Sequence, residues 1–392
     1  GKTMRRVAVL GVGMTKFGLS TKSQVEMFAE AALEAIATSN LKPRDIQALY
    51  VGNVLGDFEE GQMNIAPFCA AELGLPPEVP ATRVEGACAS ASVAIREAFL
   101  AVAGGFYDVV LVGGTERAMA MGTPLATRTF AMGTDGRYEE FTGITFPGVF
   151  ALLSRLYARE YNIPLPKLKE QMALVAVKNH RHGVQNPLAQ FRKEITVETV
   201  LNSVMIADPL QLFDCCPFSD GAAAVVLATE ELARKLVPKP VYILGIGQGS
   251  AGALFRQKGL PRIKARETAA KKAYAMAGLT PRDVQVCELH DCFTIAEIIA
   301  SEGLGFFEFG RGGEAVEKGE TTYGGRVVIN PSGGLKAKGH PIGATGAAQV
   351  YEIVKQLRGE AGPRQVEGAR IGLTDTLGGD GGTVVVTLYG IE

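Results

Sequence analysis

Residues 29–47, AEAALEAIATSNLKPRDIQ, align without gaps with residues 267–285, ETAAKKAYAMAGLTPRDVQ. The glycine-containing stretch before each segment matches as well. The spacing is far beyond the roughly 20 to 50 residues of a solenoid repeat, so we expect a duplicated domain with approximate twofold symmetry. The alternative is that LxPRD is only a common helix-to-strand turn. The matched residues are Leu41, Pro43, Arg44, Asp45 and Gln47 with Leu279, Pro281, Arg282, Asp283 and Gln285, and Val7, Leu10, Gly11 and Gly13 with Val241, Leu244, Gly245 and Gly247.

Short runs of Val, Ile and Leu alternate with alanine-rich amphipathic stretches, which is typical of buried strands joined by helices. Glycine bounds several of these runs. We therefore expect an α/β fold built in layers of helix and sheet. Strands are predicted within residues 6–13, 48–53, 108–114, 222–229, 241–247, 284–291, 370–376 and 383–390.

This alternation stops between about residues 116 and 215, where Met, Arg and Phe become frequent. We predict an N-terminal half of residues 1–115 plus 216–232, an inserted loop domain of residues 116–215, and a C-terminal half of residues 238–392. Long insertions in rigid scaffolds often cover an active site. A purely structural excursion fits the sequence equally well.

The composition excludes several classes of function. Forty Lys and Arg residues nearly balance forty-one Asp and Glu residues, so the formal net charge is −1 and no long-range field favours nucleic acid or an acidic membrane. No stretch approaches the roughly 18 to 20 apolar residues of a membrane span, and the first residues lack the features of a secretory signal. The six cysteines show neither CxxC pairs nor zinc spacing. We expect a cytoplasmic protein without a bound metal.

Cys88 lies in VEGACASASVAIREAFLAV, where a turn of small residues runs directly into an amphipathic helix. The free N–H groups and the dipole at a helix N-terminus lower the pKa of a thiol, so Cys88 is a candidate nucleophile. A buried structural cysteine in a tight turn fits the local sequence equally well.

Three histidine or cysteine residues outside this turn are further candidates. His340 follows a glycine-rich loop and stands between Gly339 and Pro341, where a general base or an oxyanion donor is favoured over core packing. The neighbouring Lys336 and Lys338 are expected to be solvated. His290 and Cys292 follow a predicted strand, at the edge of the sheet where α/β proteins bind ligands, whereas Cys287 lies inside the strand.

Two glycine-rich or small-residue segments remain. Residues 378–382, GGDGG, offer exposed backbone N–H groups, as an oxyanion hole requires. CCPFSDGAAAVVL, residues 215–227, is a loop-to-strand joint to which we assign no chemistry. Neither GxxxxGK[ST] nor a GxGxxG placed between a strand and a helix occurs, so nucleotide phosphate binding has no support.

Together these motifs resemble those of the thiolase family along essentially the whole chain. EGACASA (85–91) resembles the nucleophile motif, VVLVGGTE (109–116) the strand after its helix, and CCPFSDGAAAVVL the return from the loop domain. The most specific match is NPSGGLKAKGHPIGATG (330–346), which resembles the GHP motif. The resemblance implies a duplicated five-layer αβαβα fold with a loop domain over the active site.

The sequence differs from the best-known degradative and biosynthetic thiolases at two points. HDCF (290–293) replaces their Asn-Glu-Ala-Phe motif, and Thr376 stands where they carry a second catalytic cysteine. Both features resemble sterol-carrier-protein-type thiolases and their archaeal and bacterial relatives, in which the HDCF cysteine is the acid/base. The resemblance therefore implies that His340 activates Cys88 and that Cys292 transfers the second proton.

The resemblance also implies the remaining parts of the site. Backbone N–H groups of Cys88 and Gly378 hold the first oxyanion, and His340 and His290 hold the enolate. The substrate is a 3-oxoacyl-CoA, either acetoacetyl-CoA or an aromatic or dicarboxylic one such as benzoylsuccinyl-CoA. Coenzyme A is a substrate, with Ser250 and Gly252 as expected contacts, and no cofactor is bound permanently.

A homodimer and a separate zinc-ribbon OB-fold partner subunit are further implications of the resemblance. Two alternatives remain open. One is a condensing enzyme of the ketoacyl or hydroxymethylglutaryl synthase type, which shares the fold and the cysteine but not HDCF with GHP. The other is a non-catalytic thiolase-fold subunit that scaffolds a partner.

Overall fold

Two five-stranded sheets with the same strand order form the centre of the computed structural model, which describes residues 4–392. β1 and β8 pair over two residues and so join the sheets at one edge. The first sheet has the order β3-β2-β4-β7-β1, with β1 Val7–Met14, β2 Ala48–Gly52, β3 Ala81–Val84, β4 Val109–Arg117 and β7 Asp220–Thr229. The second has the order β10-β9-β11-β12-β8, with β8 Val241–Ser250, β9 Val286–Glu288, β10 Val328–Ile329, β11 Ile371–Gly378 and β12 Thr383–Gly390.

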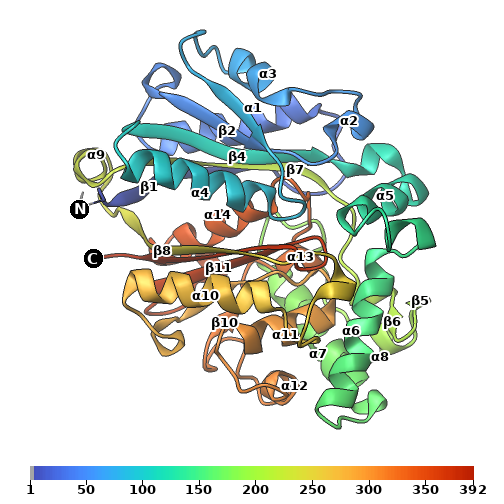
Figure 1. The fold of residues 1–392 in the computed structure, drawn as a ribbon. Helices are drawn as coiled ribbons and strands as arrows, with labels where there is room; N and C mark the ends of the chain where they lie inside the picture. Colours follow the sequence, from blue (N-terminus) through green and yellow to red (C-terminus); the bar gives the residue numbers. More distant parts are fainter. Residues whose placement is uncertain (1–3) are drawn as a thin grey trace.

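Helices cover both sheets and separate them, which makes five layers (Figure 1). α1 and α3 lie on the outer face of the first sheet, α4 and α14 lie between the sheets, and α10 and α11 lie on the outer face of the second. The helices are α1 Gln24–Thr38, α2 Gly56–Glu59, α3 Ile65–Glu72, α4 Ser90–Ala103, α5 Thr123–Phe130, α6 Phe146–Glu160, α7 Leu165–Val184, α8 Val197–Leu201, α9 Glu230–Leu236, α10 Lys264–Ala277, α11 Thr294–Gly303, α12 Gly312–Glu317, α13 Gly334–Ala337 and α14 Thr345–Leu357.

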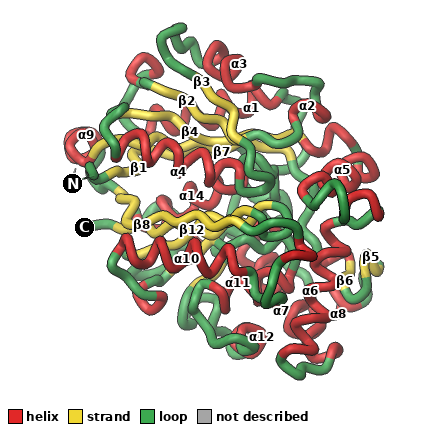
Figure 2. The backbone as a smooth tube through the Cα atoms, viewed as in Figure 1, coloured by secondary structure: helices red, strands yellow, loops and turns green. Residues whose placement is uncertain are grey.

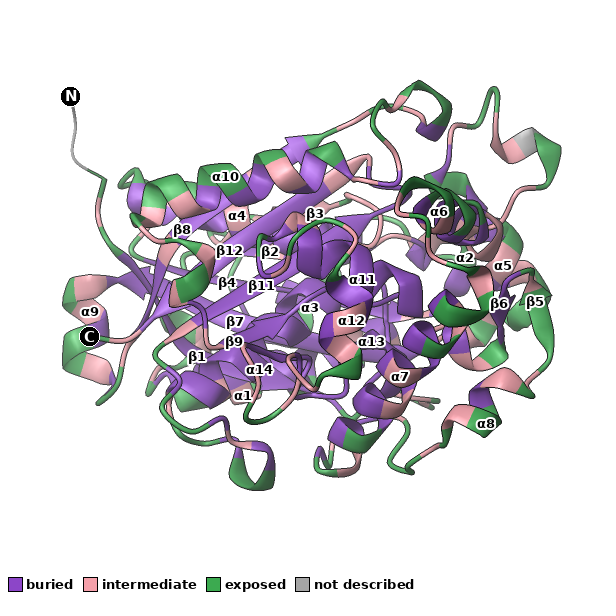
Figure 3. Cartoon of the chain, turned by 90° about the horizontal axis from the view of Figure 1, so that it is seen from below, coloured by how far each residue is buried: buried purple, intermediate pink, exposed green. Residues whose placement is uncertain are grey.

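The strands carry apolar side chains on both faces, because each sheet is covered on both sides. In β4, Val110 and Val112 point into the core around α4 and α14, whereas Val109 and Leu111 point into the core under α1 and α3. A third core joins α10 and α11 to α6 and α7 of the inserted segment. Figure 3 shows the strands of the two central sheets and α14 mostly buried, whereas exposed residues gather on loops and on outer helices such as α8 and α9.

The duplication predicted from the sequence is confirmed by the packing of the two outer helices. A Cβ on Gly11 of β1 would lie 2.2 Å from the carbonyl oxygen of Ala35 in α1, and a Cβ on Gly245 of β8 would lie 2.1 Å from that of Ala273 in α10. Only glycine allows so close an approach of strand and helix in each half. The expected five-layer fold is therefore confirmed.

The turn that follows each of these helices is also the same in both halves. The Lys42 N–H donates to Asp45 Oδ2 at 2.8 Å, and the Thr280 N–H donates to Asp283 Oδ2 at 2.8 Å. The LxPRD motif thus closes an equivalent turn into β2 and into β9.

Each strand predicted from the sequence is present, but two edge strands were missed. β3 has four residues and β10 has two, too few for an apolar pattern to stand out. Between β4 and β7 the chain leaves the sheet and forms α5 to α8 and a small hairpin of β5 Met205–Ala207 and β6 Leu210–Gln211. None of the helices between residues 4 and 392 is long and apolar enough to cross a membrane.

Candidate active site

Cys88 lies on a tight turn between β3 and α4, two residues before the helix begins. Ala87 has a φ of 51°, and the Gly86 N–H donates to Ser90 Oγ at 2.9 Å. The Ser90 hydroxyl donates in turn to the Ala87 carbonyl at 2.5 Å. These bonds hold the strained turn, so the sulfur has a fixed position at the start of α4. The predicted location of Cys88 is confirmed.

The pKa of Cys88 differs from the sequence-based expectation. Burial raises the pKa of this thiol to about 12, and the backbone N–H of Gly379 offsets this only in part. The expectation of a lowered pKa is therefore wrong, because loss of water outweighs the helix N-terminus. The thiol keeps its proton near neutral pH, and a neighbouring base must remove it.

His340 lies in the loop before α14 and is buried. Its Nδ1 is 2.5 Å from Thr345 Oγ1, and the Thr345 hydroxyl donates to the Pro341 carbonyl at 3.2 Å. The Thr345 oxygen therefore accepts a hydrogen bond from Nδ1–H of His340, which leaves the Nε2 lone pair free. Burial, with the nearby His290, holds the pKa of His340 well below its usual value, so the ring is neutral and can act as a base.

His290 follows β9 and meets His340 edge to face, with the ring centres 5.1 Å apart. The Cys88 sulfur and one nitrogen of each ring lie within 4.8 Å of one another. Burial and then Arg266 lower the pKa of His290 to about 3, so this ring is neutral as well. One sulfur and two imidazole nitrogens are also zinc ligands, and a metal bound here would block both the thiol and its base.

Cys292 and Asp291 connect the HDCF segment, which also carries His290, to the rest of the site. Cys292 is buried, its carbonyl accepts the Cys216 N–H at 3.0 Å, and burial raises the pKa of its thiol well above the usual value. The Asp291 carboxylate accepts the Leu335 N–H at 2.7 Å and the Asn179 side-chain N–H at 2.9 Å. Asp291 thus ties the HDC segment to α13, which ends three residues before His340.

A cavity of about 310 Å³ brings the predicted residues together: Cys88, His290, Cys292 and His340 all line it, with Gly379. Its other walls are mainly apolar. Phe150 stacks on Phe293 with ring centres 4.8 Å apart, and Phe130 meets Phe218 at 5.1 Å. None of the described residues that line this cavity is Asp, Glu, Lys or Arg.

A second cavity of about 140 Å³ meets the first at Cys88, Phe130 and Phe146. Val54, Leu55 and Ile342 contribute to its walls. The Cys88 sulfur therefore lies between two chambers.

Lys336 and Lys338 are buried, and the expectation that they are solvated is wrong. The Lys336 ammonium donates to His180 Nε2 at 2.8 Å, and burial lowers the pKa of Lys336 to about 8. Lys338 pairs with Glu288 at 3.4 Å. Both side chains turn inward, where Lys336 meets His180 of α7 and Lys338 meets Glu288 of β9.

Thr376, at the position of the missing second cysteine, does not line either cavity at Cys88. Its hydroxyl donates to Gln349 Oε1 at 2.5 Å and lies 2.7 Å from Ser92 Oγ. Gly378 packs directly against the turn that carries Cys88, since a Cβ there would lie 2.3 Å from the Gly86 carbonyl oxygen, and the next residue, Gly379, lines the larger cavity.

Ser250 and Gly252 are exposed at the end of β8 and in the loop after it, outside both cavities. Residues 215–218, to which the sequence assigned no chemistry, line the larger cavity instead. The only available signal was their position before β7, where the inserted segment returns to the sheet.

Comparisons with known proteins agree with this geometry. The thiolase N-terminal domain model matches residues 7–231, and a model described as thiolase C-terminal domain-like matches residues 247–391. An acetyl-CoA acetyltransferase of Methanothermobacter thermautotrophicus is 47% identical over 98% of this chain and 100% of its own length. The benzoylsuccinyl-CoA thiolase subunit BbsB of Thauera aromatica is 38% identical over 96% of each chain.

A solved structure of the Ltp2-ChsH2(DUF35) aldolase has a TM-score of 0.85 and 27% identity, covering 98% of both chains. Family models cover both halves, and the relatives align over nearly the whole length. The chain is therefore a member of the thiolase family of acyltransferase enzymes.

Proposed function

We propose that this thiolase transfers the acyl group of a 3-oxoacyl-CoA to coenzyme A through an acyl-Cys88 intermediate. The observation that carries the proposal is the cluster of the Cys88 sulfur and the ring nitrogens of His290 and His340 within 4.8 Å, at the wall of a cavity. Nucleophile and base lie within reach of one substrate carbon there.

The first half-reaction begins when His340 Nε2 takes the proton of the Cys88 thiol. The thiolate attacks the 3-keto carbon, and backbone N–H groups of Cys88 and Gly378 hold the oxyanion. The carbon–carbon bond then breaks and leaves acyl-Cys88 and an enolate, whose oxygen is held by His290 and His340. The Cys292 thiol gives its proton to the enolate carbon, and the CoA ester formed from the enolate leaves, while the shortened acyl group stays on Cys88.

The second half-reaction restores the site. The Cys292 thiolate takes the proton of the incoming coenzyme A thiol, and the resulting thiolate attacks acyl-Cys88. The Cys88 thiolate leaves and recovers its proton from His340. Cys292 suits this role because its thiol lines the cavity, whereas the Thr376 hydroxyl is bonded to Gln349.

The walls of the cavity favour an apolar acyl group. Five phenylalanines line it, Phe130, Phe146, Phe150, Phe218 and Phe293, and its volume of about 310 Å³ exceeds the needs of an acetyl group. A free carboxylate on the acyl group would lose its hydration without gaining a cation. We therefore assign an aliphatic or aryl 3-oxoacyl-CoA in preference to a dicarboxylic one.

A substrate panel tests both parts of the proposal. Coenzyme A-dependent cleavage is measured with acetoacetyl-CoA, 3-oxohexanoyl-CoA, 3-oxo-3-phenylpropionyl-CoA and a dicarboxylic analogue, with Cys88→Ala as control. The apolar substrates should show the highest kcat/KM, and mass spectrometry should find the acyl group on Cys88. Absence of an acyl adduct with every substrate would favour a non-catalytic subunit instead.

We also propose a homodimer and a separate partner subunit, and the names of two relatives support the partner subunit. BbsB is named as a subunit, and the Ltp2-ChsH2(DUF35) aldolase combines two components. In this chain β3 is an edge strand with partly exposed residues next to the Cys88 turn, which suits pairing with a second copy. Copurification of a fully active single-component dimer would count against the partner subunit.

A further inference from the structure

Arg266 and Asp375 form an ion pair in the interior of the C-terminal half. Arg266, in the first turn of α10, is 1% exposed, and Asp375 of β11 is 0% exposed. Arg266 Nε donates to Asp375 Oδ1 at 2.8 Å, and Nη2 donates to Oδ2 at 3.2 Å. The guanidinium therefore holds the carboxylate in a two-point geometry.

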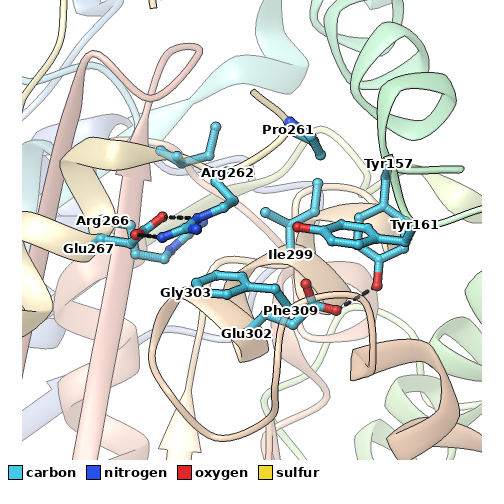
Figure 4. Close-up of a pocket in the computed structure, with 11 residues that line it drawn as sticks. Tyr157, Tyr161, Pro261, Arg262, Arg266, Glu267, Ile299, Glu302, Gly303 and Phe309 are labelled. Carbon is cyan, nitrogen blue, oxygen red and sulfur yellow. Dashed lines mark hydrogen bonds and ion pairs between the residues drawn. The ribbon is translucent and has the colours of Figure 1, made fainter. Parts of the chain in front are cut away.

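Arg266 also borders a void between α6, α10 and α11, which is shown in Figure 4. The void holds only about 10 Å³, and most of its charged groups are already paired, Arg262 with Glu267 and Glu302 with Tyr157. Ligand pockets span about 300 to 1,000 Å³, so this void is no binding site. The guanidinium is directed to Asp375.

Asp375 makes a third contact that reaches the active site. Its Oδ2 accepts the backbone N–H of His290 at 3.1 Å. The His340 ring is held through Thr345, but Nδ1 of His290 is buried without a partner among residues 4–392. The position of the His290 ring therefore depends on its backbone, and Asp375 holds that backbone.

We propose that Arg266 and Asp375 are positioning residues that hold His290 beside Cys88 and His340 for the cleavage step. The inference rests on the proposed function, in which His290 helps to hold the enolate oxygen. A buried ion pair is seldom more stabilising than an apolar pair of similar size, so stability alone does not account for two charges here. A misplacement of about 1 Å at a reacting group can cost about 100-fold in rate.

The test replaces both charges at once. Arg266→Met with Asp375→Leu removes the pair and the acceptor of the His290 N–H but leaves no unpaired charge. The matched control is Arg364→Met with Glu352→Leu, which removes another buried ion pair, at 2.9 Å, from residues that do not line either cavity at Cys88. Measurements are kcat, KM for coenzyme A, the melting temperature, and the rate of Cys88 alkylation by iodoacetamide.

The first double variant should lose about tenfold or more in kcat, with KM and the alkylation rate within twofold of wild type. Alkylation by iodoacetamide needs Cys88 and His340 but not His290. A general loss of structure would therefore lower kcat and the alkylation rate together. The control should keep wild-type kcat. A folded first variant with wild-type kcat would overturn the inference.

If that variant does not fold, Arg266→Lys decides the matter, because lysine keeps the charge but loses the two-point geometry. It should lower kcat about threefold or more with unchanged KM, and wild-type kcat would contradict the inference. An inactive wild-type enzyme across the substrate panel would instead refute the proposed function, so the two failures are distinguishable.

Discussion

The two halves of the molecule share one topology but contribute different chemistry from equivalent places. In the N-terminal half the segment between β3 and α4 carries Cys88, and in the C-terminal half the segment between β10 and α14 carries His340. α4 and α14 pack closely at their first turns, since a Cβ on Gly346 would lie 2.1 Å from Ser92 Oγ. Nucleophile and base thus occupy corresponding positions in the two copies and face each other across the pseudo-twofold axis.

The halves differ most after the fourth strand of each copy, because β4 is followed by α5 to α8 with β5 and β6, which lie together at one side of the molecule (Figure 2). After β11 a short turn of residues 379–382 leads into β12, whereas after β4 residues 118–219 intervene before β7. The short turn lets Gly379 line the larger cavity, and the long excursion supplies Phe130, Phe146 and Phe150 to its walls. One copy therefore closes this end of the sheet with a short turn, whereas the other adds most of the apolar cavity wall at the equivalent place.

Removal of the proposed nucleophile, in the N-terminal half, should lower kcat more than any other change. Cys88→Ala should lower kcat by about 10⁴-fold or more, because no other thiol stands at the start of α4. The matched control is Cys69→Ala, a buried cysteine of α3 outside both cavities, which should keep activity. A Cys88→Ala enzyme with more than about one percent of wild-type kcat would refute the assignment of the nucleophile.

The corresponding test of the C-terminal half is Cys292→Ala. We expect a loss of about 10² to 10⁴ in kcat, with the rate of Cys88 alkylation by iodoacetamide unchanged, because His340 still takes the thiol proton. Cys287→Ala, inside β9, is the control and should keep activity. Undiminished turnover in Cys292→Ala would show that another group transfers the second proton.

Thr345→Val tests whether the proton of the neutral His340 ring is held on Nδ1. Valine keeps the shape of the side chain but removes the acceptor that fixes the proton on Nδ1. We expect about a tenfold fall in kcat and in Cys88 alkylation, because the tautomer with a free Nε2 is no longer favoured. Thr387→Val, in β12 away from both cavities, is a control. Equal alkylation rates in wild type and Thr345→Val would contradict the tautomer assignment.

The last prediction concerns stability and not activity, namely the pH dependence of stability in the N-terminal half. Burial and the adjacent Glu116 raise the pKa of Glu59 to about 12. The folded state therefore keeps a proton that the unfolded state loses above about pH 4.5, and stability falls as pH rises, by at most about 1.4 kcal/mol per pH unit. The melting temperature of Glu59→Gln should fall less between pH 6 and pH 9 than that of wild type. An equal decrease in both proteins would contradict this prediction.

Much of the fold was predictable because the duplication leaves local signals. The LxPRD turn and the glycines of β1 and β8 recur since each half needs the same helix-to-strand geometry. β3 and β10 were not predictable because their short pairing depends on neighbouring strands that only the folded sheet supplies. The buried state of Lys336 was equally hidden, because His180 lies far away in the sequence.

The candidate site was predictable to a similar degree. Cys88, His290, Cys292 and His340 each follow a strand or precede a helix, and the topology brings those ends together. The pKa of Cys88 was not predictable, because burial by the inserted segment outweighs the local effect of the helix N-terminus. The roles of Arg266 and Asp375 were hidden as well, because their link to His290 passes through a backbone N–H.

The origin of the cavity walls has an evolutionary consequence. Cys88, His290, Cys292 and His340 stand on the duplicated core, whereas Phe130, Phe146, Phe150, Ile206 and Leu212 come from the segment between β4 and β7. Mutations that reshape the acyl pocket can therefore accumulate in that segment without moving the groups that break and form bonds. In such a scaffold substrate range can diversify between lineages while the chemistry is inherited unchanged.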